Sequence, residues 1–236
     1  MPAAPSGQDA PTILIAGASR GLGRAMAAEF LKKGWRVIGT VRGGGTPLHE
    51  LADGADGRLE IEVLDIDAQE QIAALRRRLS GRRLDMLFVN AGVTTRDPLA
   101  TVGTVTTDEF VRVMVTNALS PMRVIEALQD LVPATGLIGA MSSGQGSLAN
   151  NLTGEREVYR ASKAALNMSL RSFAGRPSEA RSLVLMAPGW IRTALGGPGG
   201  QFSIEENVPK VVDVLLAKRG RPGSEYLDFR GETVPW

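Results

Sequence analysis

The chain has 236 residues, 43% of them apolar and 22% charged, and its formal net charge is +2. These values are typical of a globular protein, and a single domain with one large core is expected. Nucleic-acid binding would need a coherent basic face, and the arginines crowded between residues 76 and 83 are instead expected to be a solvated helix end. The chain has no cysteine and one histidine, which excludes disulfides and thiolate metal sites, and we predict no metal ion.

Residues 1–10 contain neither a basic leader nor an apolar core, so we expect a loose N-terminal tail followed by one domain at 11–236. No later run is long and apolar enough to span a bilayer. Together with the absence of cysteine, this predicts a cytoplasmic protein without a membrane span.

Short apolar runs that alternate with helical patterns predict the secondary structure. Strands are predicted at Ile13 to Ala16, Arg36 to Val41, Leu59 to Leu64, Met86 to Asn90, Leu137 to Met141, Leu183 to Ala187 and Glu225 to Asp228. Helices are predicted at Arg24 to Lys33, Ala68 to Leu79, Asp108 to Leu131, Tyr159 to Ala174 and Ile204 to Lys218. Most strand runs are continuously apolar, which favours an α/β fold with a doubly wound parallel sheet of about seven strands and helices on both faces. The glycine and proline clusters at 43–47 and 196–200 are expected to be surface loops.

The first predicted strand leads into a glycine turn and then into a helix. Gly17, Gly21 and Gly23 are spaced G-x-x-x-G-x-G. Glycine permits a tight turn and close approach of a pyrophosphate, which the first N–H groups and the dipole of the helix can hold. In a chain with 28 glycines such a loop is weak evidence alone, but its place between a strand and a helix indicates a dinucleotide site.

Tyr159 and Lys163 lie four residues apart in a predicted helix, so both side chains can point into one pocket. A free phenol titrates near ~10, and a fixed positive charge beside it brings its pKa toward the working range. Ser143, at the end of a predicted strand, could hydrogen-bond a substrate oxygen while Tyr159 transfers the proton. Taken alone, the spacing favours an ordinary helix with a snorkelling lysine, and only the glycine turn tips the balance toward a functional pair.

The motifs, in the order in which they occur along the chain, resemble those of the short-chain dehydrogenases/reductases. The resemblance covers the chain from about Thr12 onward and includes Asn90-Ala91-Gly92, the segment from Pro188 to Thr193, and Asn117 inside the long predicted helix. The local sequence YRASKAALNM at 159–168 and the terminal Val-Pro-Trp are similar to the subgroup of small carbonyl reductases and signalling proteins that includes C-factor and sniffer.

The resemblance implies one Rossmann-like domain and an NAD(P)-dependent oxidoreductase that interconverts a carbonyl and an alcohol by hydride transfer. Ser143 would polarise the substrate oxygen, and Tyr159 would act as general acid or base. Lys163 would lower the pKa of Tyr159 and hold the nicotinamide ribose, and Asn117 would kink its helix and hold a water for proton relay. The implied catalytic residues are Asn117, Ser143, Tyr159 and Lys163. The implied cofactor-binding residues are Gly17, Ser19, Arg20, Gly21, Leu22, Gly23, Arg42, Asp65, Ile66, Asn90, Ala91, Gly92, Tyr159, Lys163, Pro188, Gly189, Ile191 and Thr193.

The choice of cofactor follows from charge. An NAD site commonly places an acid at the end of the second strand, but residues 37–42 contain none. Arg20 and Arg42 would instead bind a 2′-phosphate, so we predict NADP(H) over NAD(H), the alternative being that both arginines are merely solvated. Asp65 matches a position beside the adenine in the family but could equally cap the following helix.

The sequence departs from the family pattern at three places. Ser143 precedes Tyr159 by sixteen residues, more than is usual, so residues 150–157 are expected to form an enlarged loop near the substrate, and Ser142 remains an alternative to Ser143. Ala16 replaces a common threonine before the glycine turn, which removes a hydroxyl tie. Gly175 and Pro177 are expected to end the catalytic helix early.

The substrate and partners are less specified. The short glycine-rich segment 194–203 predicts an open pocket with a mobile lid that admits bulky carbonyls. The family's usual dimer face, on the helices at 108–131 and 159–174, implies a homodimer or homotetramer, although the stripe of Phe110, Val113 and Met114 fits either an interface or the core. The alternative to an enzyme is a signalling or redox-sensing protein that binds NADP(H) with little turnover.

Overall fold

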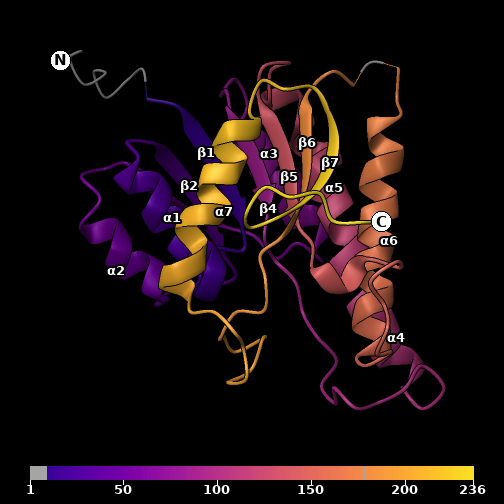
Figure 1. The fold of residues 1–236 in the computed structure, drawn as a ribbon. Coiled ribbons are helices and arrows are strands. Elements are labelled where there is room, and N and C mark those ends of the chain that lie inside the picture. Colours follow the sequence, from indigo (N-terminus) through magenta and orange to yellow (C-terminus); the bar gives the residue numbers. More distant parts are fainter. Residues whose placement is uncertain (1–9, 178) are drawn as a thin grey trace.

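The strands form one parallel sheet in the order β3-β2-β1-β4-β5-β6-β7 (Figure 1). The computed structural model describes residues 10–177 and 179–236, and all counts of elements refer to these. The strands are β1 (Thr12–Ala16), β2 (Arg36–Val41), β3 (Leu59–Val63), β4 (Met86–Val89), β5 (Leu137–Met141), β6 (Ser182–Ala187) and β7 (Gly223–Asp228). The order reverses beside β1, which makes the sheet doubly wound and confirms the predicted Rossmann-like fold.

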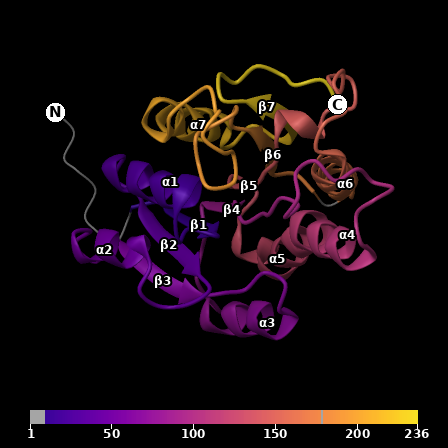
Figure 2. The same ribbon diagram turned by 90° about the horizontal axis from the view of Figure 1, so that it is seen from below.

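Helices cover both faces of the sheet (Figure 2). The helices are α1 (Gly21–Lys32), α2 (Pro47–Asp53), α3 (Gln69–Arg78), α4 (Thr107–Met114), α5 (Ser120–Leu128), α6 (Glu157–Ala174) and α7 (Ile204–Lys218). Helices α1 and α7 pack on one face with α2 beside them, and α3, α5 and α6 cover the other face. The two helix layers exclude water from both faces of the central strands.

Successive residues of the first strand show why its sequence is continuously apolar. Ile13, Leu14 and Ile15 are all fully buried. Leu14 packs in the core beneath α3, α5 and α6, whereas Ile13 and Ile15 pack in the core beneath α1 and α7. Burial of such a side chain contributes roughly 1.5–3 kcal/mol, so the central strands are rigid supports for the loops at their ends.

The helix predicted at 108–131 is interrupted near its middle. A π-helical turn at Val115–Leu119 separates α4 from α5, and the chain ends this region in a 3₁₀ turn at Gln129–Leu131. Pro121 has no N–H to donate to the carbonyl of Asn117 four residues earlier, so a regular α-helical ladder cannot continue here. The interruption lies at Asn117, where the resemblance implies a local kink.

Helix α2 is an element that the sequence analysis did not predict. The cluster at 43–47 was expected to be a loop, but Pro47 begins the helix, and the Thr46 N–H donates to Nδ1 of His49 at 3.2 Å. Proline is favoured in a first helical turn because its missing N–H would be unpaired there anyway. The seven predicted strands and the other helices are confirmed within a few residues, and α6 ends before Gly175 as expected.

Most of the predicted N-terminal tail lies outside the described residues, which begin at Ala10. Among the described residues, no helix combines the length and the apolar character that a bilayer crossing requires.

Candidate active site

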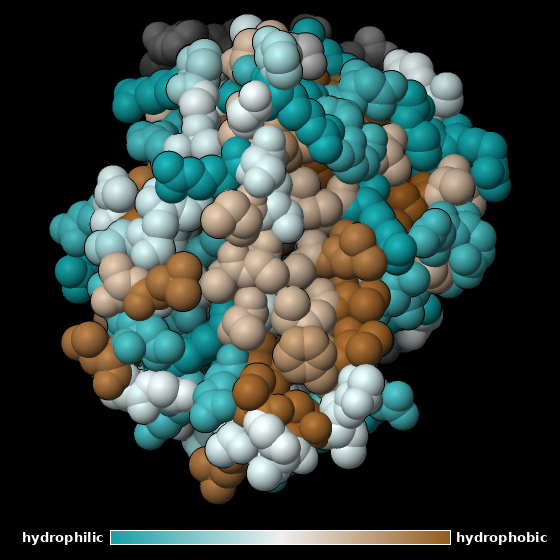
Figure 3. All heavy atoms as spheres, turned by 90° about the vertical axis from the view of Figure 1, so that its right-hand side faces the viewer, coloured by the Kyte–Doolittle hydropathy of each residue, from teal (hydrophilic) through white to brown (hydrophobic). Residues whose placement is uncertain are grey.

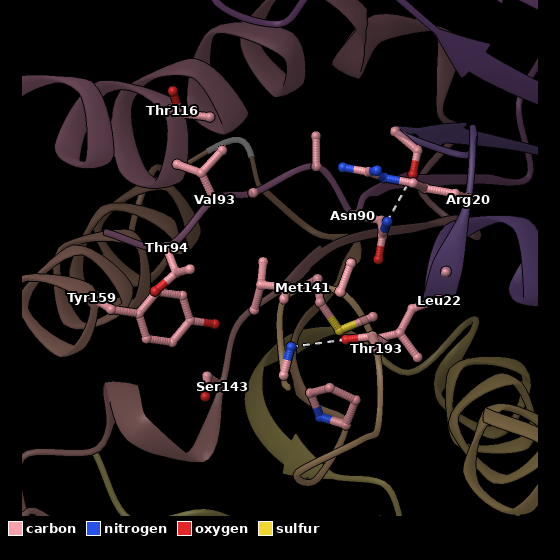
Figure 4. A pocket seen from close by; sticks show the side chains of 18 of the residues that line it. Arg20, Leu22, Asn90, Val93, Thr94, Thr116, Met141, Ser143, Tyr159 and Thr193 are labelled. Carbon is pink, nitrogen blue, oxygen red and sulfur yellow. Dashed lines mark hydrogen bonds between the residues drawn. The ribbon is translucent and has the colours of Figure 1, made fainter. Parts of the chain in front are cut away.

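A cleft of about 1050 Å³ lies at the carboxyl ends of the strands, where the strand order reverses. Of the predicted site residues, only Gly23 and Asn117 do not line it. Those that line it are Gly17, Ser19, Arg20, Gly21, Leu22, Arg42, Asp65, Ile66, Asn90, Ala91, Gly92, Ser143, Tyr159, Lys163, Pro188, Gly189, Ile191 and Thr193. Arg20, Leu22 and Asn90 lie at one end of the cleft, and Tyr159 and Ser143 lie at the other (Figure 4).

The glycine turn after β1 packs so closely against its neighbours that Gly17 and Gly23 have no room for a side chain. Gly17 has φ +89°, and a Cβ there would lie 2.7 Å from the Cβ of Ala91. A Cβ on Gly23 would lie 2.1 Å from the Gly17 carbonyl oxygen and 2.7 Å from Nδ2 of Asn90, which donates to that carbonyl at 2.7 Å. Gly23 therefore shapes the turn from behind, although it does not line the cleft.

A threonine of another strand supplies the side-chain hydrogen bond to the glycine turn that Ala16 cannot make. The Gly17 N–H donates to Oγ1 of Thr40 at 3.0 Å, and Thr40, in β2, is fully buried and lines the cleft. Sequence analysis missed Thr40 because only the parallel pairing of β1 with β2 brings it to the turn.

The end of the cleft at β2 and β3 is lined by two arginines, Arg20 and Arg42, and by the carboxylates of Asp65 and Asp67. Arg20 and Arg42 are exposed, line the cleft and form no ion pair with any described carboxylate. Asp65 also lines the cleft, and it does not cap α3, whose N-cap residue is Ala68. The turn, the N-terminus of α1 and the two free guanidinium groups fit a dinucleotide that carries an additional phosphate.

The tyrosine and lysine of α6 both reach the cleft and are almost completely buried, at 6% and 3% exposed. Lys163 Nζ donates to the Met141 carbonyl at 2.9 Å and lies 5.8 Å from the centroid of the Tyr159 ring. Burial lowers the pKa of Lys163 to about 8. Burial raises the pKa of Tyr159, while the charge of Arg156 and a hydrogen bond with Ser143 act in the opposite direction.

The geometry distinguishes the candidate serines. Both serines border the cleft, and the Ser143 hydroxyl is one of the groups that oppose the rise in the Tyr159 pKa. Ser142 is 2% exposed and its Oγ donates to Oδ1 of Asn167 at 2.6 Å, so its hydroxyl serves to attach β5 to α6. The Ser143 carbonyl accepts a hydrogen bond from the Tyr226 hydroxyl of β7, which fixes the backbone at this point. Of the two, Ser143 is the serine that can meet a substrate.

Asn117 lies behind the cleft and is fully buried. Its Oδ1 accepts from the Val93 N–H at 2.8 Å, and its Nδ2 donates to the Val93 carbonyl at 2.8 Å and to Oγ of Ser162 at 2.9 Å. The side chain thus connects the loop after β4 to the helix that carries Tyr159 and Lys163.

The segment after β6 is held by hydrogen bonds to α7 and within itself. Asn207 of α7, fully buried, donates to the Pro188 carbonyl at 2.7 Å. Trp190 Nε1 donates to the Gly196 carbonyl at 2.7 Å, and the Arg192 N–H donates to the Phe202 carbonyl at 2.9 Å. The predicted loop at 194–203 is present, and hydrogen bonds connect it to residues 190–192 that precede it.

Sequence analysis also missed Arg156, Thr94 and Arg112, which line the cleft near Tyr159. Arg156 is the N-cap residue of α6, and its guanidinium carbon lies 4.7 Å from the centroid of the Tyr159 ring. Its spacing of three residues from Tyr159 was the available signal, because residues i and i+3 share a helix face.

Comparison with known proteins identifies the family. A model described as short chain dehydrogenase matches residues 11–201. The chain belongs to the short-chain dehydrogenase family. This short-chain dehydrogenase is 65% identical to a short-chain dehydrogenase/reductase from Burkholderia multivorans with bound NADP, with a TM-score of 0.95 over 96% of this chain and 100% of that one.

Two further relatives support the predicted subgroup. A carbonyl reductase from Pseudomonas aeruginosa PAO1 in complex with NADP is 34% identical, with a TM-score of 0.89 over 97% of this chain and 100% of that one. C-signal from Myxococcus xanthus is 34% identical over 157 residues, which are 65% of this chain and 93% of that protein. The predicted family and its NAD(P)-dependent oxidoreductase activity are confirmed.

Replacement of Gly23 by alanine tests the architecture of the glycine turn. We expect Gly23→Ala to weaken NADP binding by roughly tenfold or more, since displacing a backbone carbonyl costs at least ~1.4 kcal/mol of binding free energy. Isothermal titration calorimetry measures the change. The matched control is Gly43→Ala, where a Cβ meets nothing within 4 Å. Equal affinity in both variants would contradict the proposed turn geometry.

Proposed function

We propose that this short-chain dehydrogenase is an NADP(H)-dependent carbonyl reductase in which Tyr159 is the general acid, and the general base in the reverse direction. One observation carries the proposal. The Tyr159 phenol is buried in the same cleft as the glycine turn, beside the hydroxyl of Ser143. A buried phenol and a hydroxyl that lie beside each other in a cleft fit a substrate oxygen that accepts two hydrogen bonds.

In the proposed reaction, Ser143, Tyr159 and Lys163 have different roles. When bound, NADPH would supply the hydride, which carries both electrons of the reduction. Ser143 would donate a hydrogen bond to the carbonyl oxygen, and Tyr159 would transfer its proton to the same oxygen to give the alcohol. Lys163 would hold the ribose and help return a proton to the phenolate from solvent, with a water held at the Asn117 carbonyl, which Pro121 leaves without its usual donor.

We propose NADP(H) as the preferred cofactor because of Arg20 and Arg42. Both guanidinium groups are free of carboxylate partners among the described residues, and both reach the end of the cleft near β2. A 2′-phosphate would offer each a charge-assisted hydrogen bond. The Burkholderia and Pseudomonas relatives with bound NADP support this choice.

We propose a bulky aldehyde or ketone as the substrate. Beyond Tyr159 the cleft is bordered by Val93, Trp190 and Leu195, and the last two are 51% and 38% exposed. These apolar side chains fit the hydrocarbon part of a substrate, whereas the polar groups at Tyr159 fit its carbonyl.

Tyr159→Phe tests the role of the phenol. We expect NADPH-dependent reduction of the best substrate from a panel of aldehydes, ketones and quinones to fall by ~10²- to 10⁴-fold, because the general acid is removed. Nicotinamide absorbance follows the reaction, and calorimetry with NADPH provides the control, since the variant should still bind cofactor. Near wild-type turnover in Tyr159→Phe would exclude the phenol as the acid. Tight NADPH binding without turnover on any panel member would favour the signalling alternative.

Arg42→Ala tests the preference between cofactors. Loss of one guanidinium should raise the KM for NADPH by about tenfold and leave the KM for NADH nearly unchanged, because only NADPH carries the 2′-phosphate. Arg77→Ala is the matched control, since Arg77 is an exposed arginine of α3 that does not line the cleft. A wild-type preference for NADH, or equal effects on both cofactors, would contradict the assignment.

We further propose a homodimer or homotetramer formed across α4, α5 and α6. Figure 3 shows apolar side chains gathered on this side of the molecule. Val111, Leu119 and Met168 are 49%, 45% and 64% exposed there, whereas Val113 of the predicted stripe is core. An exposed apolar face of this kind is typical of an interface.

Charge placed on that face should separate the subunits. We expect sedimentation velocity to give an oligomer for the wild-type chain and a monomer for Met168→Glu, because a buried unpaired carboxylate opposes association. Val63→Glu is the control, since Val63 is 53% exposed on β3 at the opposite edge of the sheet. A monomeric wild-type chain would refute the interface.

A further inference from the structure

Arg156 holds an unusual place beside the buried phenol. Its φ is +58°, a conformation that favours glycine, and this backbone directs the side chain into the cleft. The guanidinium carbon lies 4.7 Å from the centroid of the Tyr159 ring, and Nη2 donates to Oγ1 of Thr94 at 2.9 Å. Thr94 belongs to the loop after β4, and Figure 4 shows it next to Tyr159. Two segments therefore hold this cation against the ring.

The charge of Arg156 is not neutralised by its surroundings. No described carboxylate forms an ion pair with it, and its buried Nε has no hydrogen-bond partner among the described residues. The other two arginines at this end, Arg96 and Arg112, both pair with Glu109. The side chain of the adjacent Glu157 accepts a hydrogen bond from the Val102 N–H at 2.7 Å, and Glu155 is exposed. Among these three arginines, Arg156 is therefore the one whose positive charge no described carboxylate neutralises, so its charge can stabilise the Tyr159 phenolate.

The remaining polar and titratable groups around Tyr159 are Lys163, Ser143 and Tyr226. Lys163 donates to a backbone carbonyl, and at 5.8 Å it is farther from the ring centroid than Arg156 is. Tyr226, of β7, is neutral over the working range because burial raises its pKa to about 12. Burial raises the pKa of Tyr159, and the Arg156 charge and the Ser143 hydrogen bond oppose this rise.

We propose that Arg156 is a positioning residue for the reaction, which adds to Lys163 a second fixed positive charge beside the Tyr159 phenol and so favours release of its proton. The usual family pattern assigns this task to the lysine of the Tyr-x-x-x-Lys motif. In this chain the guanidinium lies closer to the ring, and the lysine ammonium is engaged by the end of β5. The inference rests on the proposed function, since it assumes that Tyr159 is the proton donor.

The chain has only two tyrosines, which permits a direct titration. In a Tyr226→Phe background, the phenolate absorbance reports Tyr159 alone. We expect Arg156→Gln to move this titration to higher pH by about one unit, because an opposite charge within ~4–6 Å stabilises the phenolate. Arg156→Lys, which keeps the charge, should titrate nearer to the parent. Circular dichroism checks that each variant is folded over the range used.

The pH profile of catalysis is the second measurement. Reduction requires the protonated phenol, so the alkaline fall of kcat/KM should move to higher pH in Arg156→Gln, and the rise of alcohol oxidation with pH should move in the same direction. An unchanged titration and unchanged limbs, with only a lower kcat or a higher KM, would overturn the proposal and leave Arg156 a structural or substrate-binding residue.

The absorbance titration needs no turnover, so it separates two kinds of failure. A shifted titration together with full activity of Tyr159→Phe would show that the charge acts on the phenol but that the phenol is not the acid, and the catalytic role of Arg156 would fall with it. An unshifted titration in a folded Arg156→Gln, with Tyr159→Phe inactive, would refute this inference alone.

Discussion

Because the strands are parallel, the loops that carry the candidate site residues all lie at the carboxyl ends of the strands. Side chains from the loops after β1, β2, β4, β5 and β6 meet in one cleft, although they are far apart in the sequence. The two apolar cores hold the strands in place from both faces. Because the strands cannot shift without exposing these cores, the distances across the cleft are set by the sheet and not by the loops themselves.

The two ends of the cleft use positive charge in different ways. Arg20 and Arg42 are exposed, so salt would screen their attraction for a phosphate, and in the proposed preference for NADP(H) direct hydrogen bonds would supply most of the selectivity. Lys163 is buried and Arg156 is half-buried, and charge has a longer reach where less water is present. The same dryness raises the pKa of Tyr159 and lowers that of Lys163, so burial and neighbouring charge oppose each other at the phenol.

Backbone geometry links the two ends. Asn90 fixes the glycine turn through the Gly17 carbonyl, and a few residues later Val93 is held by Asn117, which also reaches helix α6. The loop after β4 therefore contacts both the end of the cleft at the glycine turn and the end at Tyr159. Asn117 supports this loop from behind, although it does not line the cleft.

The sequence by itself determined the parts that depend on local spacing. The apolar runs specified the strands, the turn at Gly17 requires residues without Cβ, and the helical period placed Tyr159 and Lys163 on one face. Only the tertiary structure decided which neighbours these groups meet. Thr40 reaches the turn through strand pairing, and Arg156 reaches the phenol through a left-handed backbone and a hydroxyl from another loop. The contacts of Thr40 with the glycine turn and of Arg156 with Thr94 join residues distant in the chain, and no local periodicity records them.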